Sequence, residues 1–231
     1  SSRFHPDHRW GNFWSLGAAW LISEEGWFNA RALNMLKLKA SYGSQGNDNI
    51  GSFRYTDVYS IQNDGQGGVT TTLASKGNKD ITWETNTNFN AGIEFGFFNN
   101  RISGGIEYFN RMTTDMLFPT PVAPSQGYSS IYKNVGDMNN YGVETDLHFV
   151  LVNNKNVQWD FNLNASYLKN TVVSLADNVK DSKAYDAEGN EYEGFTSGSF
   201  FVAEGSSMYT WNTYDYAGID PETGKSLWWK N

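Results

Sequence analysis

The stretch that decides the fold is ITWETNTNFNAGIEFGFF, residues 81–98. Apolar residues occupy its odd positions from Ile81 to Phe97, and polar residues or glycine occupy its even positions from Thr82 to Gly96; only Thr85 and Thr87 interrupt the apolar series. Strict alternation over this length predicts a β-strand with one apolar and one polar face. The fold class expected from it is all-β.

The alternation continues beyond a turn at Asn99-Asn100, because apolar residues recur from Ile102 to Met116 with polar residues between them. The two runs therefore predict a long antiparallel hairpin. A second hairpin is predicted on either side of the Asn153–Asn156 turn, with alternation over residues 141–151 and 157–167. Residues 10–22 and 35–43 predict a third, less regular hairpin.

The segment that joins the third hairpin, Glu24–Leu36, fits a short helix with Ser23 as its cap. Between the hairpins the connections are long and rich in Gly, Asn, Ser, Thr and Pro, over residues 44–80, 118–138 and 172–205. Short turns that alternate with long connections, on strands of about 14 to 17 residues, are typical of an antiparallel transmembrane β-barrel. With one or two more strands in the tail, residues 206–229, we expect a partial barrel of about six to eight strands with long extracellular loops.

Composition excludes several classes of protein. The 231 residues include 17 Lys and Arg against 25 Asp and Glu, a net charge of −8, and Lys and Arg form no cluster, so no nucleic-acid partner is expected. Cysteine is absent, which excludes disulfides, thiolate metal sites and cysteine catalysis. No apolar run approaches the roughly 20 residues of a membrane-spanning helix.

Aromatic residues, 16% of the chain, gather near the ends of the predicted strands. Trp10 and Trp20 bracket the first strand, and Trp83 and Trp159 stand near the starts of two others. Aromatic girdles at both headgroup levels are typical of membrane barrels. Alternation alone also fits a soluble β-sandwich, so this second architecture stays open at this point.

Clusters with catalytic or metal-binding chemistry have simpler explanations here. His5-Pro6-Asp7-His8 lacks the spacing and the further ligand of a metal site, and Gly224-Lys225-Ser226 lacks the first glycine of a phosphate loop. Glu144, Asp146 and His148 alternate along one strand and better fit hydrogen bonding inside a barrel than acid–base catalysis. We therefore expect no enzyme activity, no cofactor and no metal site.

Exposed aromatic residues in the long connections are candidate contacts to a substrate or to a lid protein. This set comprises Tyr55, Tyr59, Tyr128, Tyr132, Trp211 and Tyr214. Aromatic faces with nearby amides suit a sugar or a peptide, although the same residues also suit packing of one loop against another.

Several stretches, taken in order, resemble the later part of the barrel of the SusC/RagA family of TonB-dependent outer-membrane transporters. They are RWGNFWSLGAAWLISEEGWF (9–28), LKLKASYGSQGN (36–47), ITWETNTNFNAGIEFGFFNNRISGGIEYFNRMTTDML (81–117), NVGDMNNYGVET (134–145) and YAGIDPETG (216–224). Lys39 stands where the family pattern has Arg. Each motif alone is weak, but together they cover most of the chain.

The resemblance implies a barrel of about 22 strands that is filled by a plug, energised by the TonB complex and capped by a SusD-like surface lipoprotein. Residues 1–231 would then be a fragment of the C-terminal-region barrel, with the plug domain and the remaining strands absent. The implied function is TonB-dependent import of an oligomeric nutrient, a glycan or a peptide, across the outer membrane of a Gram-negative bacterium, in contact with its lipid. Residues expected to face the lumen and hold the plug are Glu84, Asn88, Glu107, Arg111, Glu144 and Asp146.

Two rival functions remain at this stage. A secreted, soluble carbohydrate-binding β-domain would use the same exposed aromatic residues as platforms for sugar rings. A small, complete passive channel is the third reading, and the ordered motifs disfavour it.

Overall fold

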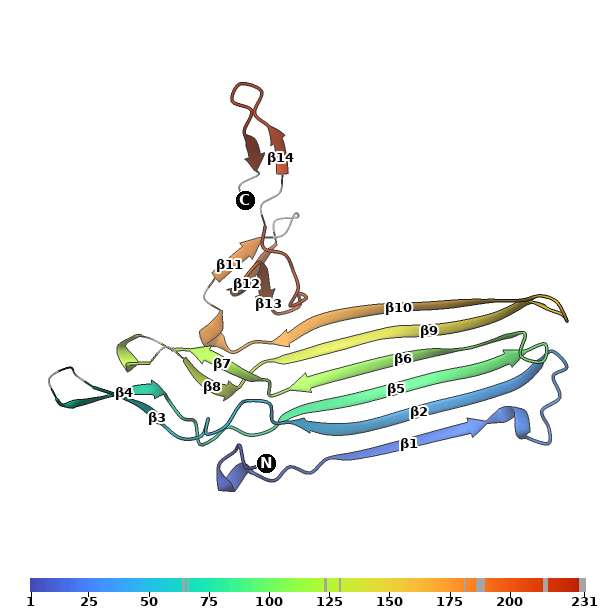
Figure 1. Cartoon of the computed structure of the whole chain (residues 1–231), viewed down its shortest axis with the longest axis horizontal. Coiled ribbons are helices and arrows are strands. Elements are labelled where there is room, and N and C mark those ends of the chain that lie inside the picture. The colour runs from blue at the N-terminus through green and yellow to red at the C-terminus, as the bar shows by residue number, and fades with distance from the viewer. Residues whose placement is uncertain are drawn as a thin grey trace.

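One antiparallel sheet of six strands dominates the computed structural model, in the order β1-β2-β5-β6-β9-β10 (Figure 1). The structure describes residues 1–63, 65, 67–122, 124–128, 130–180, 182–185, 190–213 and 216–228. The six strands are β1 (Trp14–Leu21), β2 (Leu33–Asn47), β5 (Glu84–Phe97), β6 (Ile102–Thr114), β9 (Asp137–Asn153) and β10 (Gln158–Ser174). The all-β, antiparallel prediction is confirmed.

The predicted hairpins are confirmed, and their turns lie together at one end of the sheet, which we call the short-turn end (Figure 1). Between β5 and β6, Phe98, Asn99 and Asn100 have φ of 53°, 55° and 62°. Asparagine tolerates this left-handed conformation better than most residues, so the Asn-Asn pair fixes the position of the turn. That position in turn fixes the register of the longest stretch of alternation.

The predicted helix over Glu24–Leu36 is wrong. A 3-10 turn, η2 (Ile22–Glu24), follows β1, and β2 already begins at Leu33. The backbone of residues 33–36 pairs with residues 95–97 of β5, and an isolated helix of this length is marginal in water. Pairing with the neighbouring strand therefore prevails over a weak local helix signal.

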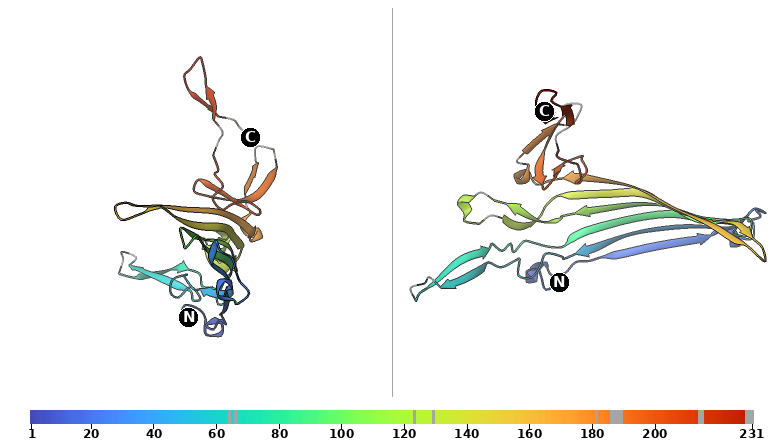
Figure 2. Two further views of the ribbon diagram at one scale, coloured as in Figure 1. Left: turned by 90° about the vertical axis from the view of Figure 1, so that its right-hand side faces the viewer. Right: turned by 45° about the horizontal axis from the view of Figure 1, so that its top comes forward.

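The long connections contain small sheets that strand alternation did not predict. Residues 48–83 carry the hairpin β3 (Val58–Asn63) and β4 (Val69–Ser75), and residues 115–136 carry β7 (Leu117–Pro121) and β8 (Ser130–Asn134). After β10, β11 (Ser182–Tyr185), β12 (Glu191–Ser197) and β13 (Phe200–Ala203) form a third sheet. All of these lie beyond the other end of the six strands, which we call the long-loop end (Figures 1 and 2).

The tail contributes β14 (Tyr216–Ile219) and β15 (Ser226–Trp228), which form a separate two-stranded hairpin. The expected extra strands thus exist, but they are short and do not extend the six-stranded sheet. Short 3-10 turns complete the described elements: η1 (Pro6–His8), η3 (Pro124–Gln126) and η4 (Asp177–Val179). Within the described part of the chain, no helix has the length and apolar content needed to cross a membrane.

A small apolar core lies at the long-loop end. Phe4, Ile50 and Ile81 are buried there, and partly buried rings and a leucine pack around them: Tyr55, Trp83, Leu117 and Tyr132. The segment before β1, the β2–β5 connection and the β7–β8 hairpin therefore meet in one cluster. Because burial of a large apolar side chain contributes about 2 kcal/mol, this cluster holds the three segments together.

Hydrogen bonds reinforce this junction. Asn134 donates to the carbonyls of Thr82 (2.9 Å) and Asp115 (3.0 Å), and its own Oδ1 accepts from the Thr82 amide (2.8 Å). Asn78 donates to the carbonyl of Tyr132 (2.8 Å), and the Arg54 guanidinium lies 4.7 Å from the centre of the Tyr132 ring. The first two long connections are thus fastened to each other as well as to the sheet.

The segment after β13 returns to the free edge of β10. Val172 donates its amide to the carbonyl of Ser206, and Gly205 donates to the carbonyl of Val172, both at 2.8 Å. The Glu204 carboxylate accepts from the Leu175 amide (2.8 Å) and pairs with Lys180 (2.9 Å). The Leu175 amide, and Lys180 after it, hold the pKa of the Glu204 carboxyl below its usual value. These contacts cover only the C-terminal end of the β10 edge.

The six-stranded sheet is twisted and is not closed on itself (Figure 2). Within the described residues, β1 pairs only with β2, and the part of β10 toward the short-turn end pairs only with β9. The sheet therefore has the form of a section of wall with two free edges.

Candidate functional site

The six-stranded sheet has two chemically different faces, as strand alternation requires. We call the face that carries Lys39, Glu94 and Glu107 the polar face and the opposite one the apolar face. Cross-strand pairing aligns the polar positions, because Asn88 stands opposite Arg111, Arg111 opposite Asn140, and Glu107 opposite Glu144. All six residues predicted to face a lumen lie on the polar face: Glu84, Asn88, Glu107, Arg111, Glu144 and Asp146.

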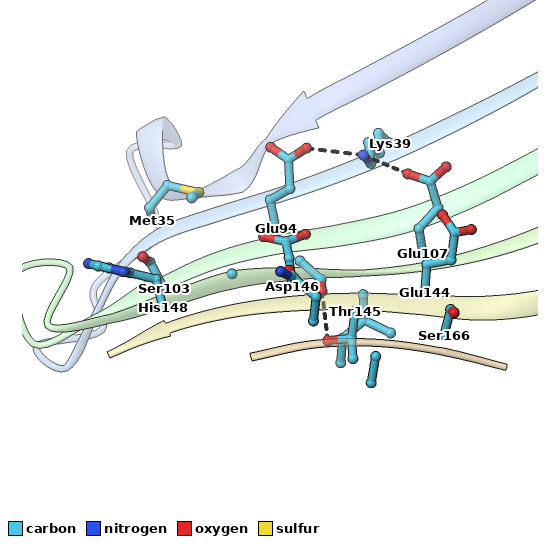
Figure 3. Close-up of a pocket in the computed structure, with 15 residues that line it drawn as sticks. Met35, Lys39, Glu94, Ser103, Glu107, Glu144, Thr145, Asp146, His148 and Ser166 are labelled. Carbon is cyan, nitrogen blue, oxygen red and sulfur yellow. Dashed lines mark hydrogen bonds and ion pairs between the residues drawn. The ribbon is translucent and has the colours of Figure 1, made fainter. Parts of the chain in front are cut away.

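A charge network crosses three strands of the polar face (Figure 3). The Lys39 ammonium lies 3.2 Å from a carboxylate oxygen of Glu94 and 2.6 Å from one of Glu107. Lys37 reaches the other oxygen of Glu94 at 3.1 Å. Two lysines on β2 thus neutralise one glutamate on β5 and one on β6. Lys37, Lys39 and Glu94 were not predicted as a set, although alternation along β2 and β5 puts all three on one face.

Beyond this network the polar face is hollowed. A depression of about 640 Å³ is lined by Glu94, Glu107, Glu144, Asp146, His148 and Ser166, among others. Glu144 stands directly opposite Glu107, whose carboxylate is already paired with Lys39. Within the described residues, the carboxylates of Glu144 and Asp146 make no hydrogen bond or ion pair, and Figure 3 shows them facing the hollow. Like charges placed directly opposite are destabilising, so Glu144, which stands opposite Glu107, calls for a positive partner.

A second depression, of about 500 Å³, lies nearer the long-loop end of the same face. Five side-chain amides contribute to its lining, and Thr113 donates to Asn86 at 2.7 Å. The Arg111 guanidinium lies 4.9 Å from the centre of the Phe109 ring and makes no ion pair within the described part of the chain. Arg111 is therefore a cation that is available to an anionic group on this face.

Glu84 differs from the other predicted lumen residues. One of its carboxylate oxygens accepts from the Asn47 amide group at 2.8 Å, and the other accepts from the Leu117 backbone amide at 3.2 Å. Its hydrogen bonds thus fasten β2 and β7 to the start of β5. Because Leu117 is distant in sequence, alternation gave no signal of its hydrogen bond to Glu84.

The apolar face bears two levels of aromatic side chains. Nearer the short-turn end lie Trp20, Phe95, Phe97, Phe149, Trp159 and Phe161, and about halfway along the strands lie Tyr42, Phe89, Tyr108, Tyr141 and Tyr167. On β5 the belt runs from Phe89 to Phe97, a length of nine residues. A tilted strand needs roughly 9 to 11 residues to cross a bilayer. Several side chains of this face are highly exposed, 72% at Leu16 and 60% at Trp159, as a lipid-facing surface requires.

Trp83 does not belong to either aromatic level. Its ring centre lies 5.3 Å from those of Phe4 and Phe13, at the long-loop end. Its Nε1 is buried without a hydrogen-bond partner within the described residues. Trp10 is 91% exposed and lies outside the strands. Of the tryptophans predicted to form girdles, Trp20 and Trp159 therefore stand on the belt.

The candidate loop aromatics divide into packed and exposed residues. Tyr55 and Tyr132 pack around the small core, and Tyr128 donates its hydroxyl to Gln126 at 2.8 Å. Tyr59 on β3 is 59% exposed, and Trp211 is 67% exposed although its ring centre lies 4.8 Å from that of Phe200. Tyr214 lies outside the described residues. Among the described candidates, Tyr59 and Trp211 are thus the two with the most exposed rings.

No group of three metal-ligand side chains occurs within the described part of the chain. His5 Nδ1 lies 3.2 Å from the Asp7 carboxylate.

Comparison with known proteins gives a consistent result. The family model described as TonB dependent receptor-like, beta-barrel, matches residues 1–228. The TonB-dependent receptor P39 of Formosa agariphila is 31% identical over 223 residues, 95% of this chain and 20% of that protein. The TonB-dependent receptor SusC of Bacteroides thetaiotaomicron is also 31% identical over 223 residues, 87% of this chain and 22% of that protein.

Solved structures agree with these relatives. The RagAB peptide transporter matches with a TM-score of 0.84 and 30% identity over 98% of this chain and 24% of that chain. The RagAB peptide importer in its "open-open" state matches with a TM-score of 0.82 at the same identity and coverage. The chain therefore spans between a fifth and a quarter of the length of these proteins.

Proposed function

The chain belongs to the TonB-dependent receptor-like β-barrel family, and we propose that it supplies part of the wall and the extracellular loops of an importer of oligomeric nutrients. Members of this family, SusC and RagAB included, are outer-membrane proteins of Gram-negative bacteria. The observation that carries the proposal is the two-faced sheet, with its apolar belt on one side and its charged, hollowed face on the other. Lipid on one side and a hydrated interior on the other account for both faces.

In this proposal residues 1–231 form a fragment of the C-terminal region of the barrel, and further strands of the parent protein complete the wall. The free edges of β1 and β10 support this, because unpaired backbone groups inside a bilayer cost several kcal/mol each. The share of the relatives that the chain covers, 20% to 24%, is in keeping with a section of a larger barrel.

The polar face is proposed to hold a plug domain. Arg111, Glu144 and Asp146 are charged and unpaired within the described residues, so they are the positions where a plug gains most by bringing opposite charges. Glu84, Asn88 and Glu107 share the same face, but Glu84 and Glu107 are already engaged within the wall. Glu84 and Glu107 would stiffen the wall on which the plug rests.

The proposed partners are a SusD-like surface lipoprotein at the long-loop end, the TonB complex acting through the plug, outer-membrane lipid at the apolar belt, and a glycan or peptide substrate. The relationship to SusC and to a peptide transporter supports this set. The exposed faces of Tyr59 and Trp211 are suited to contact the lipoprotein or the substrate. The alternative function, a secreted carbohydrate-binding domain, is not supported, since members of the family are outer-membrane proteins.

Uptake measurements test the proposal. The full-length protein is produced in a Gram-negative host that lacks other transporters of this family, and uptake of fluorescent maltoheptaose and of a fluorescent decapeptide is followed. We expect uptake of one probe, and its loss when TonB is deleted. Uptake of neither probe, or uptake that persists without TonB, contradicts the proposal.

A further inference from the structure

Three depressions of the polar face adjoin one another. A depression of about 250 Å³ shares Lys39 and Glu107 with the one of about 640 Å³, and it shares Ser41 and Asn90 with the one of about 500 Å³. Together they extend over residues 103–113 of β6, along the direction of the strands. We call the three depressions the polar furrow. The furrow thus leads from the long-loop end toward the short-turn end.

Unpaired charges of both signs lie in the polar furrow. The charge network of β2, β5 and β6 is neutral in itself, because its two lysines balance its two glutamates. Arg111, Glu144 and Asp146 also line the furrow, and within the described residues none of the three makes an ion pair or a side-chain hydrogen bond. The furrow therefore has a free cation in one depression and two free carboxylates in another.

Strand pairing fixes the distance between these opposite charges. Arg111 stands opposite Asn140 on β9, and Glu144 and Asp146 follow Asn140 by four and six residues, toward the short-turn end. At about 3.3 Å per residue, the charges lie roughly 13 to 20 Å apart along the sheet. An extended peptide of about four to six residues holds its terminal ammonium and its terminal carboxylate at the same separation.

The cationic end of the furrow is prepared for a carboxylate. The Arg111 guanidinium lies 4.9 Å from the centre of the Phe109 ring, and Phe109 is only 4% exposed, so the support beneath the cation is fixed. The Asn140 Oδ1 accepts from Asn170 at 2.7 Å, while the Asn140 amide hydrogens have no acceptor within the described residues. A carboxylate here accepts from Arg111 and from Asn140 together, and fixed donors lower the cost of binding it.

Other classes of ligand satisfy only part of the furrow. A neutral glycan leaves all three charges unpaired. A polyanionic glycan pairs with Arg111 but is repelled by Glu144 and Asp146, and a polycation meets the converse conflict. A chain with a positive end and a negative end satisfies both depressions at once. A peptide with free termini carries this pair of charges at neutral pH.

From this arrangement we propose that the polar furrow selects short zwitterionic peptides and orients them with the N-terminus toward the short-turn end. The terminal carboxylate pairs with Arg111 and accepts from Asn140, and the terminal ammonium pairs with Glu144 and Asp146. The inference rests on the proposed function, because a peptide reaches the furrow when the plug moves off the polar face. It deepens that function by choosing peptide over glycan.

Uptake of end-blocked peptides tests this inference. The full-length protein is produced in a Gram-negative host that lacks other transporters of the family. An isotopically labelled hexapeptide of alternating glycine and serine is supplied in four forms: with free ends, N-acetylated, C-amidated, or blocked at both ends. The quantity measured is the initial uptake rate below saturation, minus the rate without TonB. In the wild type each block should lower this rate about fivefold, the effect of one partly hydrated ion pair.

Substitutions assign each preference to its residues. Arg111→Gln should import the free and the C-amidated peptide at equal rates but still prefer a free N-terminus, and Arg111→Lys should keep both preferences. Glu144→Gln combined with Asp146→Asn should lose only the preference for a free N-terminus. A residue that merely holds the plug would change uptake of all four peptides by the same factor, so the selective loss separates the two roles.

Arg31→Gln is the matched control, because Arg31 is an exposed arginine in the β1–β2 connection, at the short-turn end. It should keep both preferences. A heat-modifiable band on electrophoresis confirms that each variant is folded. The inference is overturned if the wild type imports all four peptides equally, if Arg111→Gln keeps the preference for a free C-terminus, or if Arg31→Gln loses it.

A glycan probe separates this inference from the transport proposal. TonB-dependent uptake of fluorescent maltoheptaose, without such uptake of any hexapeptide, overturns the inference and leaves the transport proposal standing. TonB-dependent uptake of neither kind of probe overturns both.

Discussion

Phe109 on β6 stands directly opposite Gly142 on β9, and the phenyl ring occupies the space that a side chain at position 142 would need. A Cβ at Gly142 would lie 2.9 Å from the Phe109 ring and 2.0 Å from the carbonyl oxygen of Tyr167. Phe109 is thereby 4% exposed although it lies on the polar face. Its ring in turn supports the Arg111 guanidinium, so one glycine shapes the surroundings of an unpaired cation.

Gly142→Ala is expected to destabilise the wall, because the β9 and β10 backbones must move apart to admit the methyl group. Overpacking of this kind costs about 1 to 3 kcal/mol. The measurement is the urea midpoint for unfolding of the full-length protein in detergent, followed by tryptophan fluorescence. Gly26→Ala is the control, since a Cβ there meets nothing within 4 Å. Equal midpoints for the two variants contradict the packing argument.

Phe4→Ala is expected to loosen two distant connections at once, because Phe4 is fully buried between Ile50 and Ile81 in the small core at the long-loop end. Loss of a buried phenyl ring costs about 3 kcal/mol. Hydrogen exchange measured by mass spectrometry should therefore rise together over residues 48–57 and 130–134. Trp10→Ala is the control, as Trp10 is near in sequence but 91% exposed. Faster exchange in only one of the two segments would show that the connections are independent.

Strand alternation was sufficient to predict the wall. Ile81 to Phe97 and Tyr141 to Tyr167 are paired as expected, because a slip by one residue would turn every apolar side chain of β5 or β10 to the other face. The same parity rule put all six predicted lumen residues on one face. These features depend on neighbours within a strand, which a sequence displays directly.

Features that depend on distant contacts were not predictable in this way. The carboxylate of Glu84 is bound by Leu117, and Trp83 packs against Phe4, across separations that no local pattern encodes. The small sheets in the connections also escaped, since β3 and β4 alternate over only a few residues next to glycine-rich turns. The helix expected over Glu24–Leu36 failed for the related reason that its partner strand is far away in sequence.

Lys39→Gln is expected to destabilise the wall by about 1 kcal/mol, the upper range for a partly exposed ion pair. Lys39 bridges Glu94 and Glu107, so its loss leaves Glu107 opposite Glu144 without a cation, while Glu94 keeps Lys37. The urea midpoint of the full-length protein measures the effect. In a double-mutant cycle, Glu107→Gln should cost less in the Lys39→Gln background than in the wild type. Additive effects would mean that the pair contributes nothing measurable.

The β3–β4 hairpin should loosen in acid. The hydrogen bond from Lys76, and then that from the Gly77 amide, lower the pKa of the Asp57 carboxyl at the base of the hairpin. A carboxyl whose pKa is lower in the folded state stabilises that state above its unfolded pKa, about 3.9, and loses this effect as the pH falls through the folded value. Hydrogen exchange over residues 58–63 and 69–75, corrected for its intrinsic pH dependence, should therefore rise below about pH 4.

The Asp57→Asn variant should show the faster hydrogen exchange already at pH 7. Acid should raise its exchange rate little further. Asp80→Asn is the control, because Asp80 lies in the same connection and its carboxylate makes no ion pair within the described residues. A wild-type hairpin whose corrected exchange is the same at pH 3 and pH 7 would remove the Asp57–Lys76 pair as the cause.

Glu144→Gln combined with Asp146→Asn is expected to weaken retention of the proposed plug. Both carboxylates face the hollow without a partner in the described chain, and Glu144 stands opposite a second glutamate, so a plug cation gains strongly by binding there. A hydrogen bond to a charged group contributes about 2 kcal/mol. Removal of both charges should therefore lower the urea concentration at which the full-length protein opens a conducting pore in a planar bilayer. Glu222→Gln, an exposed change in the β14–β15 turn, is the control and should leave that concentration unchanged. If the double variant opens no earlier than the control, Glu144 and Asp146 do not hold the plug. In that case the like charges on β6 and β9 must be balanced by mobile cations from the lumen, and raised salt alone, without either substitution, should then change the stability of the wall.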